Sequence, residues 1–247
     1  MNESGQKNTS TSVLVVGLVL LAFVAGYLFN RVKTLEQKVG SSNNQQVAGA
    51  QQQEAPPAPT ELKIAKPSSD KDHWKGDKNA RYIMVEYSDD ECPFCKTFHP
   101  TAQRLLDENK GKVAWVFRHF PLSFHANAQK EAEASECAFD QGGDSAFWKY
   151  TDTIFERTTS NGTGFALDKL VPLAKELGLK ETEFKSCLDS NKFEKKVKDQ
   201  LNEGSSAGVA ATPTTVIYDM KTGKQKVIEG ALPYESVKTQ LEELMKG

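Results

Sequence analysis

Two cysteines separated by two residues, Cys92 and Cys95, stand where a strand pattern changes into a helix pattern. The run before them, RYIMVEY at residues 81–87, is apolar and rich in β-formers and predicts a buried central strand. After them, apolar residues recur at helical spacing from Phe98 to Leu106. A C-x-x-C pair can bind a metal, form a structural disulfide or act as a reactive redox pair.

The surrounding sequence argues against the first two uses. Cys92, Cys95 and His99 would supply three zinc ligands, but a closed structural site needs a fourth, and no second C-x-x-C or paired His follows. A disulfide across a two-residue loop stabilises little. With Pro93 at the first helical position, Cys92 lies at the positive end of the helix dipole. Cysteines in such motifs have pKa values of about 3.5 to 7.5, and an exposed thiolate beside a more buried partner suits thiol–disulfide exchange.

The N-terminal part of the chain has a different character. Residues 13–29 are all apolar or small, just long enough to cross a thin hydrocarbon core at about 1.5 Å per residue. We predict a short tail at 1–12 and an uncleaved transmembrane anchor at 13–30; a cleaved signal peptide is the alternative. Basic residues are denser after the anchor than before it, so the positive-inside rule alone would leave the rest of the chain in the cytoplasm.

The remainder divides into a linker and one globular domain. Residues 31–70 are rich in Gln, Ser, Ala and Pro and predict a flexible linker. The globular domain is predicted at 71–247. Within it we expect further strands at 112–120, 213–219 and 225–230, a helical insertion at about 126–205, and a last helix opened by Pro233. Without the insertion the order is β-α-β followed by β-β-α. The formal net charge of −2 over 247 residues argues against nucleic-acid binding.

The globular part resembles the DsbA family of thioredoxin-fold oxidoreductases, and within it the membrane-anchored enzymes of Gram-positive bacteria. The segments that carry the resemblance are, in chain order, VEYSDDECPFCKTFHP, VAWVFRHFPLSFHANA, EAEASECAFDQ, AFWKYTDTIFE, GVAATPTTVIYD and GALPYESV. The resemblance implies an α/β thioredoxin fold with a helical insertion. It implies that Cys92 is the nucleophile, that Cys95 is its partner, and that the backbone of Thr212 binds substrate beside a cis Pro213. From the residues alone, Pro213 is equally compatible with an ordinary trans proline.

Glu86 interrupts the apolar strand six residues before Cys92. Burying an unpaired carboxylate is costly, so packing alone does not explain this residue. The resemblance implies that Glu86 moves a proton to or from Cys95, with a pKa that burial raises. The alternative is a strand-edge glutamate that reaches solvent. Arg118 or Lys96 is the expected partner of the carboxylate.

Four more residues lie in segments that resemble the family or on predicted helices. His119 and His125 are expected to make structural hydrogen bonds rather than to take part in catalysis. Cys137 and Cys187 are expected to form a second, structural disulfide, because an extracellular domain usually pairs its remaining cysteines. Two buried free thiols are the alternative.

Four residues around the nucleophile bear on its redox properties. Asp89, Asp90 and Glu91 come directly before Cys92 and would disfavour its negative charge if they lay within about 6 Å. Phe94 donates no hydrogen bond to a thiolate, whereas a His at that position would. We therefore expect a milder oxidant than family members with His in the central dipeptide.

The function implied is that of a membrane-anchored protein-disulfide oxidoreductase with its catalytic domain outside the cytoplasm. The expected partners are unfolded or partly folded exported proteins and a quinone-linked membrane reoxidase, and neither a metal nor an organic cofactor is expected. The sequence leaves open whether the enzyme acts as an oxidase or as a reductase or isomerase. A different class, a tethered chaperone or binding module, would keep its activity after Cys92→Ala.

Overall fold

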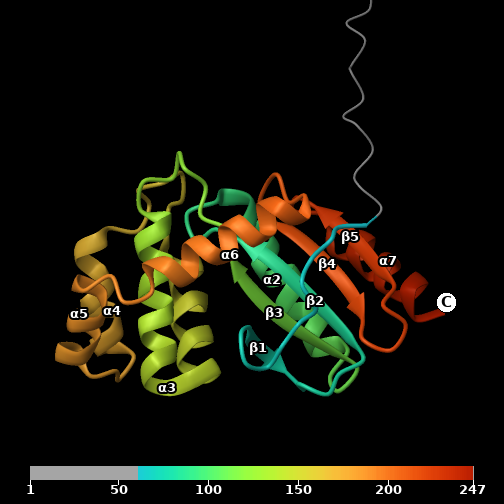
Figure 1. Cartoon of the computed structure of the whole chain (residues 1–247), viewed down its shortest axis with the longest axis horizontal. Coiled ribbons are helices and arrows are strands. Elements are labelled where there is room, and N and C mark those ends of the chain that lie inside the picture. Colours follow the sequence, from blue (N-terminus) through green and yellow to red (C-terminus); the bar gives the residue numbers. More distant parts are fainter. Residues whose placement is uncertain (1–60, 247) are drawn as a thin grey trace, which may run out of the picture. The chain divides into compact units, whose positions relative to one another are not determined.

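A five-stranded mixed sheet forms the centre of the domain in the computed structural model, which describes residues 61–246 (Figure 1). Across the sheet the strands run in the order β1 (His73–Gly76), β3 (Val113–His119), β2 (Tyr82–Ser88), β4 (Thr214–Asp219) and β5 (Gln225–Glu229). The central strands β2 and β3 are parallel, and every other neighbouring pair is antiparallel. All residues of β2 and β3 are buried, as their nearly continuous apolar runs predict for strands covered on both faces.

Helices cover the two faces of this sheet. On one face, α2 (Pro93–Glu108) and α7 (Tyr234–Lys246) pack their apolar stripes against Met84, Trp115 and Ile217. On the other face, the C-terminal part of α6 (Glu194–Ala207) packs near Tyr87, and its Gly204 allows the close approach, because a Cβ there would lie 2.8 Å from the Tyr87 ring. The parallel β2-α2-β3 unit and the β4-β5-α7 unit together make a mixed α/β thioredoxin-like fold.

A helical insertion separates β3 from β4 (Figure 1). It consists of α3 (Ala128–Arg157), the short η2 (Leu167–Lys169), α4 (Leu170–Glu176), α5 (Glu181–Asp189) and α6. The backbone of α3 is interrupted by non-helical conformations at Gly142 and Gly143. A disulfide joins Cys137 of α3 to Cys187 of α5 with a Cα–Cα separation of 6.0 Å, which is the pairing expected from the sequence. The insertion therefore lies close to its predicted range of 126–205.

The packed domain starts earlier than residue 71, so the predicted linker is too long at its C-terminal end. Leu62 and Ile64 are buried in the core, and the N–H of Lys63 donates to the carbonyl of Ala207 at 3.2 Å. Strand β1 was not predicted either, since four residues reading HWKG give no strand pattern. The predicted tail, the anchor at 13–30 and most of the linker lie outside the described residues. Within residues 61–246, no helix is long and apolar enough to cross a membrane.

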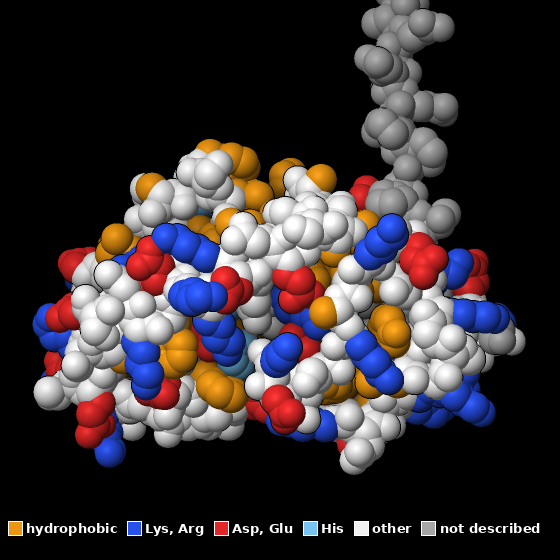
Figure 2. Space-filling model, in the orientation of Figure 1, with side chains coloured by type: hydrophobic (Ala, Val, Ile, Leu, Met, Phe, Trp, Pro, Cys, Tyr) orange, Lys and Arg blue, Asp and Glu red, His pale blue; other side chains and the backbone are white. Residues whose placement is uncertain are grey.

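The surface of the domain mixes charges of both signs. Figure 2 shows Lys and Arg side chains interspersed with Asp and Glu over the face in view. Charges of both signs on this face agree with the small formal net charge of −2 for the whole chain.

Candidate active site

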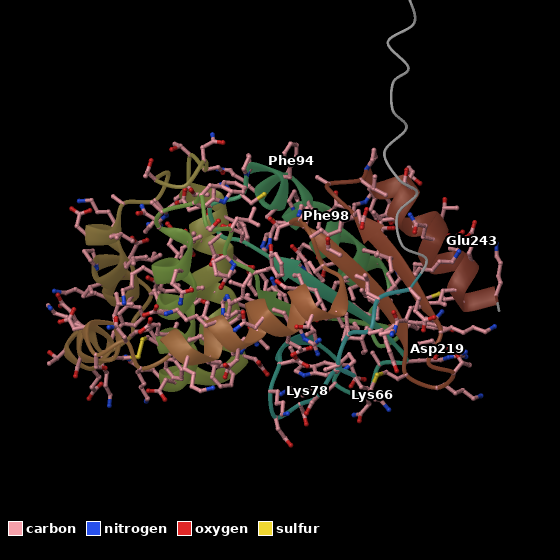
Figure 3. The ribbon with its side chains drawn as sticks, turned by 45° about the horizontal axis from the view of Figure 1, so that its top comes forward. Lys66, Lys78, Phe94, Phe98, Asp219 and Glu243 are labelled. Atoms are coloured by element: carbon pink, nitrogen blue, oxygen red, sulfur yellow. A yellow bond between two sulfur atoms is a disulfide. The ribbon has the colours of Figure 1, made fainter. Side chains whose placement is uncertain are left out.

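Cys92 caps the N-terminus of α2, and Cys95 lies in its first turn. Pro93 takes the first helical position, and the N–H of Lys96 donates to the carbonyl of Cys92 at 3.0 Å. Both cysteines are buried free thiols. Between them, Phe94 is 62% exposed and stands at the start of the helix (Figure 3). The start of α2 thus exposes the apolar side chain of Phe94 to solvent, whereas the neighbouring Cys92 and Cys95 are buried.

The segment before β4 faces Cys92. The peptide bond between Thr212 and Pro213 is cis, as the resemblance implied. In its protonated form, the Cys92 thiol donates to the carbonyl oxygen of Thr212 at 3.5 Å. Residues 120 positions apart in the sequence are therefore in contact, and the backbone of residue 212 lies next to the sulfur with which a substrate would react.

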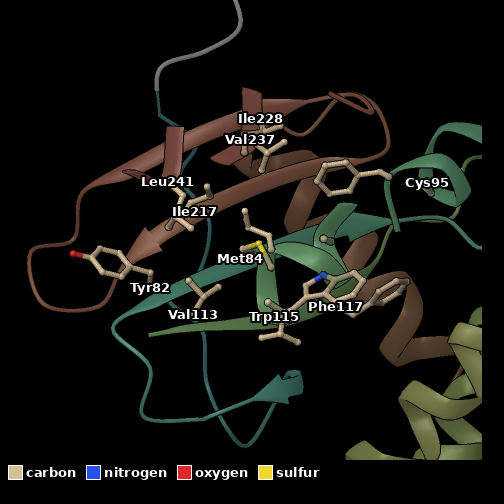
Figure 4. Packing of buried hydrophobic residues seen from close by; sticks show 14 of the residues in the cluster. Tyr82, Met84, Cys95, Val113, Trp115, Phe117, Ile217, Ile228, Val237 and Leu241 are labelled. Atoms are coloured by element: carbon tan, nitrogen blue, oxygen red, sulfur yellow. The ribbon is translucent and has the colours of Figure 1, made fainter. Parts of the chain in front are cut away.

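The two thiols have pKa values shifted in opposite directions. A hydrogen bond from Cys95 lowers the pKa of Cys92 to about 6, helped by the backbone N–H groups of Phe94 and Cys95 and opposed by burial. Burial raises the pKa of Cys95 well above its usual value, and the negative charge of Cys92 adds to this effect. At neutral pH the pair therefore consists of a thiolate at Cys92 and a protonated thiol at Cys95, one turn further into the helix. Figure 4 shows Cys95 among the core side chains that pack on the sheet.

Glu86 is fully buried in the middle of β2, which excludes the alternative of an edge glutamate that reaches solvent. Burial raises the pKa of Glu86 to about 7, while the side chains of Ser88 and Trp115 lower it. The indole Nε1–H of Trp115 donates to Oε2 of Glu86 at 3.0 Å. The expected partners were wrong: Arg118 pairs with Asp72 at 2.8 Å, and the Lys96 ammonium donates to backbone carbonyls at the end of α3. A carboxyl with a pKa near neutrality can both give and take a proton at physiological pH.

The acidic residues before Cys92 mainly hold nearby loops. Asp89 accepts hydrogen bonds from the N–H groups of Glu91 and Leu122 and lies 2.8 Å from Nδ1 of His125. Glu91 accepts from the N–H groups of Gly164 and Phe165 at 2.7 and 2.8 Å. Burial raises the pKa of Asp90 well above its usual value, and the charges of Asp89 and Glu91 add to this effect. The pKa of Cys92 is lowered in spite of these three acids.

Comparison with known proteins bears on this geometry. The family model described as thioredoxin matches residues 68–243. The crystal structure of Pseudomonas aeruginosa DsbA2 superposes with a TM-score of 0.61 at 33% identity, over 73% of this chain and 96% of that one. The chain belongs to the DsbA family of thioredoxin-fold thiol–disulfide oxidoreductases. Oxidised BdbD from Bacillus subtilis, at 27% identity and a TM-score of 0.63, is similar over 76% of this chain and all of that one.

Curated sequences give a second set of relatives. The Na⁺/H⁺ antiporters NhaA 1 of Salinispora arenicola and NhaA 3 of Salinispora tropica are 33% and 32% identical to this chain over 146 residues. The match covers 59% of this chain and 21% of each antiporter. The chain thus spans about a fifth of the length of these relatives. The match shows that a domain of this kind also occurs within longer proteins.

The DsbA-like domain does not bring together the three ligands of the zinc alternative. Nε2 of His99 binds Asp152 at 2.9 Å, and the ring packs against Trp115 and Phe155. Among residues 61–246, the group of His, Cys, Asp or Glu side chains spaced closely enough to hold a metal ion lies elsewhere. The cysteine pair is therefore left to thiol chemistry.

That group is a buried network which the sequence did not reveal. Nε2 of His73 and of His119 lie 2.8 and 3.2 Å from Oε1 of Glu136, and the Lys196 ammonium lies 2.7 Å from Oε2. We interpret it as a structural charge network, because Lys196 already supplies the cation that a buried carboxylate requires. His125 makes the structural hydrogen bond expected of it, with Asp89 at 2.8 Å. His119 contacts Glu136 within the network but without the hydrogen-bond geometry that was expected. The partners of His73 come from helices far along the chain.

Proposed function

We propose that this chain is a membrane-anchored oxidase that introduces disulfides into exported proteins. The observation that carries the proposal is the opposite protonation of the two sulfurs, with a thiolate at Cys92 and a thiol at Cys95 beside the buried Glu86. A low pKa stabilises the reduced enzyme and makes Cys92 a good leaving group, which favours donation of a disulfide to substrate.

The reaction starts from the Cys92–Cys95 disulfide. A substrate thiolate attacks Sγ of Cys92, the bond to Cys95 breaks, and Cys95 takes a proton from the carboxyl of Glu86. The backbone of Thr212, which faces Cys92, holds the substrate chain during this step. A second substrate thiolate then attacks the substrate sulfur of the mixed disulfide, and Cys92 leaves as a thiolate. The substrate is oxidised by two electrons and the enzyme is reduced by two; a quinone-linked membrane partner reoxidises it.

The location proposed for the domain is outside the cytoplasm, with the apolar segment at 13–30 as its anchor. The Cys137–Cys187 disulfide supports this location, because structural disulfides persist in oxidising compartments and are rare in the cytosol. The exposed Phe94 beside the pair suits contact with the apolar segments of unfolded substrates.

Refolding of a reduced, unfolded protein that needs two disulfides tests the activity. In a glutathione redox buffer the protein should accelerate disulfide formation, and Cys92→Ala should abolish the effect. With Cys95→Ala, glutathione disulfide oxidises Cys92 to a mixed disulfide, a substrate thiolate displaces the glutathione, and the resulting mixed disulfide with substrate should accumulate. Refolding assistance that survives Cys92→Ala would instead identify a binding or chaperone module. A redox titration with glutathione sets the direction: a potential at or below about −270 mV, the value of thioredoxin, would favour a reductase.

A further inference from the structure

Trp115 binds the carboxyl group of Glu86, the residue proposed to exchange a proton with Cys95. Its indole Nε1–H donates to Oε2 of Glu86 at 3.0 Å, while Oε1 of Glu86 is buried without a hydrogen-bond partner. We propose that Trp115 is a positioning residue for the disulfide exchange, which fixes Oε2 and leaves Oε1 to exchange a proton with Cys95. This inference rests on the proposed function, because it needs Glu86 to act as the proton carrier.

The indole is itself held in place by three elements. Trp115 is fully buried in β3, and its ring lies 4.9 Å from that of His99 in α2 and 4.6 Å from that of Trp148 in α3, measured between centroids. Asp152 of α3 binds both His99 at 2.9 Å and Lys75 of β1 at 2.8 Å, and the Lys75 ammonium lies 5.4 Å from the Trp115 ring centroid. These packed and ion-paired neighbours fix the orientation of the Trp115 ring. Its Nε1–H therefore points toward Glu86.

The position of Glu86 suits proton transfer to the buried Sγ of Cys95. Glu86 lies on the same face of β2 as Met84, and Met84, Trp115 and Cys95 belong to one core cluster (Figure 4). The negative charge of Glu86 raises the pKa of Cys95, so the two groups interact directly through space. Besides Cys95, the titratable groups that interact with Glu86 are Cys92 on α2 and Asp90 after β2.

The chemical role of the indole follows from its hydrogen bonding. An indole N–H is a donor only and neither accepts nor relays the transferred proton. A donor favours the charged carboxylate over the neutral acid, so the indole, together with the Ser88 side chain, counteracts the burial that raises the Glu86 pKa to about 7. When Cys95 gives its proton to Oε1, the thiolate formed attacks Sγ of Cys92 in a mixed disulfide, and the bound thiol leaves as a thiolate. Trp115 therefore stabilises the charged form of the carboxyl without carrying a charge of its own.

A single-turnover measurement tests this role in the full-length protein. The Cys92 mixed disulfide with thionitrobenzoate is formed, and the release of the coloured thiol by Cys95 is followed from pH 5 to pH 9. In the wild type the rate should rise with pH with a midpoint at about 7, the pKa of Glu86. Trp115→Phe removes the donor and should move the midpoint up by about one pH unit or more, the size expected for a lost hydrogen bond to a charged group.

Trp148→Phe is the matched control. Trp148 is a buried indole of the same cluster, packed against Trp115 with the ring planes tilted by 48°, but its Nε1–H has no hydrogen-bond partner. The same loss of ring volume should therefore leave the midpoint in place. A shift of equal size in both variants would mean that packing alone matters and would overturn the proposal.

Glu86→Gln separates the inference from the proposed function. If this variant keeps the midpoint near 7, then Glu86 is not the proton carrier and the proposed mechanism fails. If it removes the midpoint while Trp115→Phe leaves it unchanged, only the role of Trp115 is wrong. Should Trp115→Phe not fold, the indole N–H resonance of Trp115 in the wild type still decides. It should titrate with a midpoint near 7 and cease to do so in Glu86→Gln, and a resonance that does not titrate in the wild type contradicts the proposal.

Discussion

The two sulfurs of the active site differ in protonation although only two residues separate them. Both belong to the same buried cluster, but Cys92 receives hydrogen bonds from the backbone N–H groups of the helix start, whereas burial dominates at Cys95. Because the pKa of Cys92 is lowered to about 6, its thiolate is present above that pH and is lost as the pH falls through it. The rate of Cys92 alkylation by iodoacetamide should therefore reach half of its plateau near pH 6, with Cys95 unmodified. A midpoint near 8.5, as in a free cysteine, would contradict the structure.

The central dipeptide gives a second prediction for a single residue. Phe94 is largely exposed, so a His at this position should fit without disturbing the core. A His donates a hydrogen bond or a positive charge to the Cys92 thiolate and should stabilise the reduced enzyme. Phe94→His should thus be more oxidising than the wild type in a glutathione redox titration, and Phe94→Leu is the control that adds no donor. A His variant that is no more oxidising would show that the dipeptide does not set the potential.

Residue chemistry was predictable from the sequence only where it is local. The pattern of a strand, then Cys92, then Pro93 placed the thiolate correctly, because a helix start acts on its own first turn. The environment of Glu86 was foreseen as buried, but its partner was not. Trp115 lies 29 residues further on and meets Glu86 because β2 and β3 pair in parallel. Such a contact depends on strand register, and a local pattern does not contain that information.

At the scale of elements, long apolar runs in the sequence predicted the central strands. The short, more polar edge strand β1 has no such run and was not predicted. β2 and β3 are buried along their whole length, so hydrophobicity alone marks them. β1 has only four residues, and it exists because its backbone pairs with β3 in antiparallel register. The same holds for Leu62 and Ile64, two isolated apolar residues in a polar stretch that gain their place by packing beside α6.

The disulfide between α3 and α5 leads to a prediction about the insertion. Cys137 and Cys187 are 50 residues apart, and closing a loop of this length stabilises by roughly 3 to 4.7 kcal/mol in the chain-entropy model. Replacing both cysteines with Ala should lower the free energy of unfolding by about this amount in urea. The Cys92 alkylation profile should stay unchanged, because the bond lies within the insertion and not at the redox pair. Equal stability of the two proteins would show that the disulfide does not constrain the unfolded chain.

For the whole molecule, two physical arguments about location disagree. The basic residues after the apolar run at 13–29 favour a cytoplasmic domain under the positive-inside rule. The structural disulfide and a redox pair suited to oxidative folding favour an oxidising compartment. We give more weight to the second argument, because charge near a single anchor is a bias that long domains overcome. A structural disulfide, in contrast, is rare in proteins of reducing compartments.

Protease treatment of intact spheroplasts tests the location directly. The full chain should sediment with membranes and resist carbonate extraction, and a variant that lacks residues 1–30 should not. Protease added outside should remove the domain of the full chain while a cytoplasmic marker survives. After mild reduction of the intact cells, thiol labelling before lysis should modify Cys92 while Cys137 and Cys187 stay oxidised. Full protection of the domain until the membrane is permeabilised would place it in the cytoplasm, as the positive-inside rule predicts. The proposed role in folding exported proteins would then be wrong.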